Sequence, residues 1–135
     1  MSFLPVYLDS SAILKLVLPE QQSAALKSAL DRWPDWVSSE LAAVECHRAV
    51  RRRGENASLQ ARVTHVLASC TLIRLDTALM RLAERIGPPM IRSLDAIQLA
   101  AALSIGDYPA AFITYDDRLA AAARSLKLSV LQPGR

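Results

Sequence analysis

The chain has 135 residues, of which 52% are hydrophobic and 21% are charged, so it can bury a full core. This composition excludes a disordered tail, and we expect a single domain spanning residues 1–135. The formal net charge is +3, with 13 Arg against only three Lys residues, and Arg matches phosphate oxygens in a two-point fashion. A basic stripe on a solvated helix face is at least as common as one that binds a phosphate backbone. The charge alone therefore leaves nucleic-acid binding open.

The cysteine content and the uncharged stretches bear on the compartment. Cys46 and Cys70 have neither the spacing of a paired motif nor that of metal ligands. A disulfide framework is therefore not expected, and a reducing cytoplasm fits the chain best. The longest stretches without charge are eleven residues each, against the roughly 18 needed to indicate a membrane span. We expect a cytoplasmic protein with no membrane segment.

Strand and helix patterns alternate along the whole chain. Short apolar runs predict strands at residues 5–8, 35–38, 71–75, 111–115 and 129–131. Helical periodicity and capping residues predict helices at 12–17 (opened by Ser10 and Ser11), 21–31, 39–54, 57–69, 77–86, 93–105 and 117–126. Strands that alternate with helices favour a parallel sheet covered on both faces. The predicted fold class is α/β, with three α/β/α layers and a central parallel sheet.

Two acidic residues stand at the ends of predicted strands, where ligands bind in open α/β sheets. Asp9 follows the first strand directly, and Asp116 follows the strand at 111–115 directly. Each also precedes a predicted helix, and because Asp is a preferred N-cap, an ordinary capping role is the alternative for both. The adjacent Asp117 is expected to face solvent, because it lies about 200° from Leu119 on the helical wheel.

A third acid lies in an apolar helical pattern. Glu45 shares the predicted apolar stripe of the third helix with Leu41 and Val44. A carboxylate in such a stripe is costly unless it is paired or bound to a cation. A salt bridge to Arg48 or Arg52, one or two turns along, is the structural alternative.

Asp95 completes a set of four acids that could meet in one cleft. It lies in the first turn of the least polar predicted helix, where the helix dipole alone also favours an acid. Four carboxylates in one cleft would raise one another's pKa values unless a cation neutralised them. Carboxylate and water ligands suit Mg²⁺ or Mn²⁺, which can activate water and stabilise charge on a phosphoryl group. The candidate catalytic and metal-binding residues are Asp9, Glu45, Asp95 and Asp116.

Four short sequence motifs resemble those of a known family. They are VYLDSSA at 6–12, SELAAVE at 39–45, SLDAIQLA at 93–100 and FITYDDRL at 112–119. In this order and at these intervals they resemble the PIN-domain ribonucleases, specifically the VapC toxins of bacterial type II toxin–antitoxin modules. By this resemblance the four acids form the acidic quartet, with Ser11 and Thr114 as polar neighbours. Many relatives carry a His where this chain has Gln98, a departure that we interpret as neutral because the position is not one of the acids.

The resemblance implies a fold, an activity and partners. The fold would be a PIN-like α/β/α sandwich, and the activity would be Mg²⁺-dependent endoribonuclease cleavage, with Mn²⁺ able to substitute. Water activated by the metal would hydrolyse an RNA phosphodiester bond, and Arg48, Arg52 and Arg92 are candidates for contacting the RNA. As a toxin, the protein would form a homodimer and would be held in check by a cognate VapB-like antitoxin.

The first two predicted helices carry more apolar residues than one buried helix face can use. With two tryptophans nearby, part of this surface is expected to form a protein interface, and the resemblance implies an antitoxin segment there and a homodimer contact elsewhere. The residues concerned are Ile13, Leu14, Leu16, Val17, Leu18, Trp33 and Trp36.

Three other functions stay open at this point. One is a PIN-like RNA-binding or protein-binding module whose metal site is catalytically silent, although all four acids are present. A haloacid-dehalogenase-type phosphatase would need a second Asp two residues after Asp9, where Ser11 stands. A phosphoacceptor receiver would need an acidic pair near the first strand, whereas the pair here is Asp116 and Asp117. The phosphatase and the receiver fit the sequence less well than a nuclease does. A nuclease assay distinguishes the catalytically silent module from an active enzyme.

Overall fold

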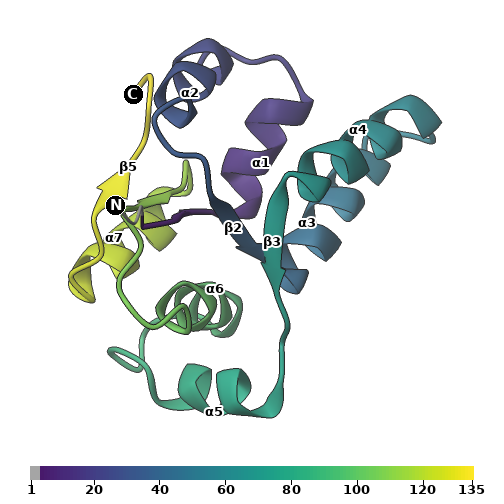
Figure 1. Ribbon diagram of the computed structural model, residues 1–135. Coiled ribbons are helices and arrows are strands. Elements are labelled where there is room, and N and C mark those ends of the chain that lie inside the picture. Colours follow the sequence, from purple (N-terminus) through teal and green to yellow (C-terminus); the bar gives the residue numbers. More distant parts are fainter. Residues whose placement is uncertain (1–3) are drawn as a thin grey trace.

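The computed structural model describes residues 4–135, which form a five-stranded parallel sheet between two layers of helices (Figure 1). The strands are β1 (Val6–Leu8), β2 (Trp36–Ser39), β3 (Cys70–Ile73), β4 (Ala111–Ile113) and β5 (Val130–Leu131). The helices are α1 (Ser10–Val17), α2 (Ser23–Leu30), α3 (Glu40–Arg51), α4 (Ala57–Ala68), α5 (Thr77–Arg85), α6 (Ser93–Leu103) and α7 (Asp117–Ser125). The predicted three-layer α/β fold is confirmed. No helix in this described part is long and apolar enough to cross a membrane.

The strand order places a topological switch point beside β1. The order across the sheet is β3-β2-β1-β4-β5, and every neighbouring pair is parallel. The chain runs outward from β1 through β2 to β3, then returns to the other side of β1 with β4. In open parallel sheets, ligands bind at the carboxyl ends of the strands where this reversal occurs. The ends of β1 and β4, aligned with Leu8 opposite Ile113, therefore mark the expected ligand site.

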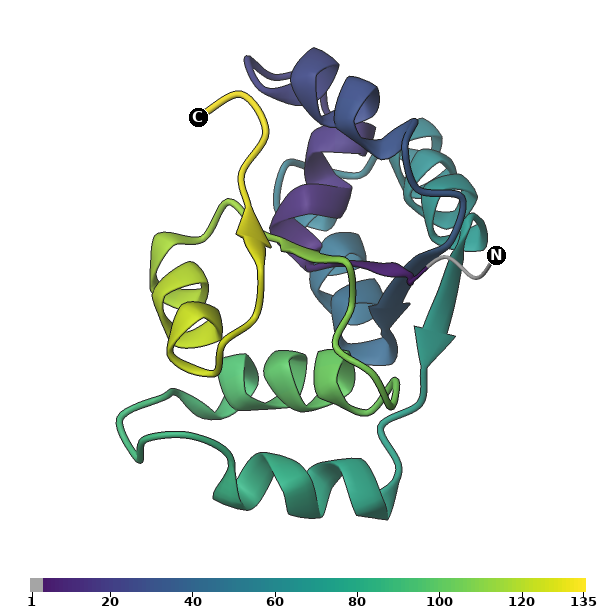
Figure 2. The same ribbon diagram turned by 60° about the vertical axis from the view of Figure 1, so that its left-hand side comes forward.

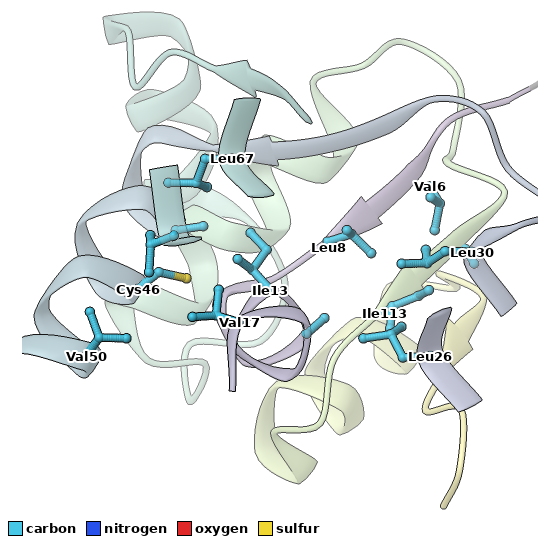
Figure 3. Close-up of a cluster of buried hydrophobic side chains, with 14 residues drawn as sticks. Val6, Leu8, Ile13, Val17, Leu26, Leu30, Cys46, Val50, Leu67 and Ile113 are labelled. Atoms are coloured by element: carbon cyan, nitrogen blue, oxygen red, sulfur yellow. The ribbon is translucent and has the colours of Figure 1, made fainter. Parts of the chain in front are cut away.

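Side chains alternate between two apolar cores, one on each face of the sheet. Val6, Leu8 and Ile113 pack against the α1–α4 layer, as Figure 3 shows for the largest cluster. Tyr7 and Phe112 point to the opposite face, toward the layer of α5, α6 and α7, which Figure 2 shows on the other side of the sheet. Because burying a Val, Leu or Ile side chain contributes roughly 1.5–3 kcal/mol, these two cores fix the register of the central strands.

The end of β4 differs from the prediction. β4 stops at Ile113, so Asp116 lies three residues beyond the strand rather than directly after it. Two backbone N–H groups bond to side-chain hydroxyls here: the Tyr115 N–H donates to the Ser11 hydroxyl at 2.8 Å, and the Asp116 N–H donates to the Thr114 hydroxyl at 3.0 Å. Side-chain hydroxyls thus replace the ladder partners and turn the chain toward α7.

The buried face of α3 also differs from the prediction. The core residues of this helix are Ala42, Cys46 and Val50, whereas Val44 is 56% exposed. The predicted stripe was therefore wrong by one residue, or about 100° of rotation. Small side chains explain the difference, because the Cys46 thiol lies 3.6 Å from the Ser10 carbonyl of α1 and allows the two helices to approach closely.

Candidate active site at the carboxyl edge of the sheet

Asp9 is the most buried carboxylate of the site, with 2% of its surface exposed. It follows β1 and caps α1, where its Oδ1 accepts hydrogen bonds from the Ala12 N–H at 2.9 Å and the Ser11 hydroxyl at 2.7 Å. Its Oδ2 accepts a hydrogen bond from the Thr114 hydroxyl at 2.5 Å. All three donors are neutral. The capping role is thus confirmed, yet it leaves the negative charge without a basic partner among the described residues.

The surroundings of Asp9 oppose its ionisation. Burial raises the pKa of this carboxyl to about 6, while the hydrogen bonds from Thr114, Ser11 and Ala12 lower it. The negative charge of Asp116 contributes to this raised pKa, so the two acids lie close enough to repel each other. A buried, repelled carboxylate of this kind is what a bound cation would stabilise.

Asp116 lies across the switch point from Asp9 and caps α7. Its Oδ1 accepts hydrogen bonds from the Arg118 and Leu119 N–H groups at 2.9 and 3.1 Å. Thr114, which is fully buried, connects the two acids, because its hydroxyl donates to Asp9 and accepts from the Asp116 N–H. Ser11 and Thr114 therefore contact the acids as the resemblance implied.

Glu45 lies on α3 and is held by a side chain of α6. Its Oε1 accepts a hydrogen bond from the Gln98 amide at 2.8 Å, and the Gln98 Oε1 accepts one from the Tyr7 hydroxyl at 2.5 Å. The alternative of an ion pair with Arg48 or Arg52 is not observed among residues 4–135.

The charges of Asp9 and Glu45 act on the same two buried groups. Burial raises the pKa values of the Tyr7 hydroxyl and the Cys46 thiol, and both carboxylates raise them further. Tyr7 therefore stays protonated as a hydrogen-bond donor. Asp9, directly after β1, and Glu45, on α3, thus act on the same two buried groups, although they are 36 positions apart in sequence.

Asp95 is engaged by a basic residue. Its Oδ2 lies 3.2 Å from the Arg118 Nε, and its side chain is 12% exposed while that of Arg118 is 54% exposed. The first turns of α6 and α7 thus meet at this ion pair. A divalent cation at Asp95 would compete with Arg118 for the carboxylate.

The described side chains do not by themselves form a complete metal site. Within residues 4–135, no three His, Cys, Asp or Glu side chains lie close enough, as they stand, to hold a metal ion. The donor chemistry nevertheless fits a hard cation, because the groups on hand are carboxylate and hydroxyl oxygens and two of the acids repel each other. Such an ion would rely on water ligands as well as on these side chains.

Asp117 behaves as the helical wheel predicts. It begins α7, its side chain is 71% exposed, and it pairs with Arg135 at 3.0 Å. The hydrogen bond from Arg135 lowers the pKa of this carboxyl. Asp117 therefore faces solvent in an ion pair of its own, although it adjoins Asp116 in sequence.

The basic candidates lie at the surface. Arg48 and Arg52, together with Arg51, line a groove of about 340 Å³ at the carboxyl end of α3. Arg92 is exposed at the start of α6, three residues before Asp95. All of these guanidinium groups are accessible to a phosphate backbone.

Sequence reasoning missed three contacts of this site: Tyr7, Gln98 and Arg118. Gln98 follows Asp95 by three residues, so it lies on the same helix face, and this spacing could have revealed it. Tyr7 gave a weaker signal, since a tyrosine in a buried strand needs a partner for its hydroxyl. Nothing in the sequence pattern distinguished Arg118 from the other arginines.

Comparison with known proteins identifies the family of this chain. The family model described as PIN domain matches residues 6–125. The chain is 41% identical to ribonuclease VapC46 of Mycobacterium tuberculosis over 128 residues, covering 95% of this chain and 97% of that protein. It is 39% identical to ribonuclease VapC35 of the same organism over 134 residues, covering 96% and 98%. Its fold is similar to that in a toxin–antitoxin complex from Klebsiella pneumoniae, with a TM-score of 0.69, 18% identity, and 95% and 97% coverage.

The match to the PIN-domain family model extends over far more than half of the chain. The protein therefore belongs to the PIN-domain family and, within it, to the VapC ribonucleases, the toxins of VapBC toxin–antitoxin systems. This membership removes the phosphatase and receiver alternatives and disfavours a catalytically silent module.

Proposed function

We propose that this VapC ribonuclease hydrolyses RNA phosphodiester bonds with the help of Mg²⁺ or Mn²⁺ held by Asp9, Glu45, Asp95 and Asp116. The observation that carries the proposal is the position of Asp9. Its carboxylate follows the central strand at the topological switch point, is almost completely buried, and has only neutral hydrogen-bond donors around it. A buried carboxylate without a basic partner is costly, and a divalent cation offsets that cost.

The chain's own residues would then hold the acids in place. When bound, the divalent ion would supply a water of lowered pKa and would stabilise negative charge on the phosphate. Ser11 and Thr114 fix the orientation of Asp9, and the capping hydrogen bonds of α7 fix Asp116. Exposed Arg48, Arg52 and Arg92 would contact the RNA backbone through their guanidinium groups.

The chemistry of the cleavage products tests this proposal. Metal-activated water leaves a 5′-phosphate and a 3′-hydroxyl, whereas attack by the ribose 2′-hydroxyl leaves a cyclic phosphate. Purified protein should be incubated with structured RNAs, with Mg²⁺ or with EDTA, and the ends analysed. We expect cleavage only with the metal and only 5′-phosphate ends. Cleavage in EDTA or cyclic phosphate ends would contradict the mechanism.

We also propose that the surface formed by α1, α2 and the start of β2 binds a VapB-like antitoxin segment. Leu14, Leu16, Leu18, Trp33 and Trp36 pack against the core there but are only partly buried. The similarity to a protein solved as a toxin–antitoxin complex supports such a partner. A crystal structure of the complex tests this proposal, and an antitoxin that leaves α1 and α2 uncovered would contradict it.

A homodimer through a different surface, and action in the cytoplasm, complete the proposal. Both thiols are free, which fits a reducing compartment. Light scattering across a concentration series tests the dimer, and a monomer at all concentrations would contradict it.

A further inference from the structure

A chain of two hydrogen bonds joins all three layers of the fold behind Glu45. Tyr7 belongs to the central strand, Gln98 to α6 and Glu45 to α3. Tyr7 is fully buried and its ring stacks on Phe112, with centroids 5.1 Å apart and planes 4° from parallel. Gln98 is 3% exposed. The hydrogen bonds therefore run from a fully buried, stacked ring in the core to the Glu45 carboxylate.

The chemistry of the three groups fixes the direction of both hydrogen bonds. An ionised carboxylate only accepts, so the Gln98 amide must present its NH₂ group to Glu45. Its carbonyl oxygen must then face Tyr7, and the Tyr7 hydroxyl must donate to it. The Gln98 amide thus uses both of its ends, and no buried polar side-chain atom in the described residues is left unpaired.

Glu45 has no other anchor of this kind. It lies on the partly exposed face of α3, next to Val44, and forms no ion pair with a described residue. A glutamate has three rotatable side-chain bonds, so without Gln98 its carboxylate would sample several positions, including ones directed at solvent. The hydrogen bond from Gln98 selects the position at the acidic edge.

We propose that Gln98 is a positioning residue that holds the Glu45 carboxylate at the active site, and that the buried Tyr7 hydroxyl fixes the orientation of its amide. This inference rests on the proposed role of Glu45 as a metal ligand. It replaces the interpretation of Gln98 as neutral. Outer partners that orient metal ligands commonly contribute 10–100-fold, in order of magnitude, to metal affinity or activity.

Histidine is the replacement at position 98 that should preserve function. A neutral imidazole has one N–H donor and one acceptor nitrogen, as the glutamine amide has a donor and an acceptor end. Histidine at position 98 could therefore accept from Tyr7 and donate to Glu45. Leucine has a similar volume but neither group, so it would leave both neighbours without their partner.

Three variants of the protein, Gln98→Leu, Gln98→His and Tyr7→Phe, test the role of the chain of hydrogen bonds. Steady-state RNA cleavage gives kcat and KM, and calorimetric titration with Mn²⁺ alone gives metal affinity without reference to activity. Thermal unfolding followed by circular dichroism verifies that each variant is folded. Gln60→Leu is the matched control, because Gln60 also bridges two helices, through hydrogen bonds to the His47 ring and carbonyl.

We expect Gln98→Leu and Tyr7→Phe to lower kcat and Mn²⁺ affinity by roughly 10–100-fold, with little change in KM. Gln98→His should retain most of the kcat and of the Mn²⁺ affinity, and Gln60→Leu should change neither. If Tyr7 acts through Gln98, the double variant Tyr7→Phe/Gln98→Leu should be no worse than Gln98→Leu alone.

Several results would overturn the proposal. Folded Gln98→Leu protein with normal kcat and Mn²⁺ affinity would remove the positioning role, and additive losses in the double variant would remove the part of Tyr7. If Gln98→Leu failed to fold, the near-isosteric Tyr7→Phe would decide, and its normal activity would overturn the proposal. Glu45→Gln distinguishes failure of the positioning role of Gln98 from failure of the proposed function. Full activity in that variant would refute the role of Glu45 itself, and hence the proposed function.

Discussion

Replacing Asp9 with Asn should stabilise the protein in the absence of divalent cations. Burial raises the pKa of the Asp9 carboxyl from 3.8 to about 6, so the folded protein disfavours the ionised form. A shift of roughly two units corresponds to about 3 kcal/mol of lost stability once the group is ionised in both states. Asn is close in shape, can still accept from Ala12 and Ser11, and carries no charge to bury.

The pH dependence fixes the sign of this effect. Because the folded pKa is above the unfolded one, the penalty is absent well below pH 3.8, grows as the pH rises, and is complete above about pH 6. In EDTA at pH 8, Asp9→Asn should therefore unfold roughly 10 °C above the wild type. At pH 4 the difference should nearly vanish. Added Mg²⁺ should stabilise the wild type more than the variant, because it binds only the folded site.

Differential scanning calorimetry at several pH values measures this directly, with Asp117→Asn as the matched control. Asp117 is exposed and its pKa is lowered by Arg135, so its replacement should give no stabilisation at pH 8. An Asp9→Asn protein no more stable than the wild type at pH 8 in EDTA would refute the reasoning. So would a stabilisation that is equally large at pH 4.

Three further predictions concern activity and binding. Asp116→Asn should lose nearly all RNA cleavage, whereas Asp117→Asn should retain most of it; the reverse result in a cleavage assay would mean that the strand end was misassigned. Arg118→Gln should tighten Mn²⁺ binding by up to about fivefold in calorimetric titration, because a competitor for Asp95 is removed. The exposed Arg124→Gln is its control, and equal affinities in both variants would refute the competition. Arg48→Gln should reduce the salt dependence of RNA binding, lowering the slope of log K against log salt by about 0.7 in filter binding; an unchanged slope would exclude a phosphate contact.

Much of the fold could be predicted from local signals in the sequence. Capping residues set the helix starts. Asn56 precedes an amphipathic run, which indicates an N-cap, and its side chain accepts a hydrogen bond from the Leu59 N–H. The position of Asp9 after a short buried strand likewise placed it at the carboxyl edge of the sheet. These features depend on neighbours within a few residues, which is why sequence alone was informative about them.

Features that depend on contacts between distant segments could not be predicted. The orientation of α3 depends on how closely Cys46 approaches α1, and the periodicity of Leu41 and Val44 pointed to the wrong face. The end of β4 depends on the Ser11 hydroxyl, more than 100 positions away in sequence. For the same reason the hydrogen bonds of Gln98 were not anticipated, because their partners lie on two other layers of the fold.

Diffraction from crystals soaked in Mn²⁺ tests the central claim most directly, because the anomalous signal locates the ion independently of activity. We expect a peak at the carboxyl edge of the sheet between β1 and β4, with oxygen atoms of Asp9 and at least one other member of the quartet at about 2.1 Å, or one water further away. No peak at that edge at saturating Mn²⁺, or a peak bound only by other residues, would contradict a metal site formed by Asp9, Glu45, Asp95 and Asp116.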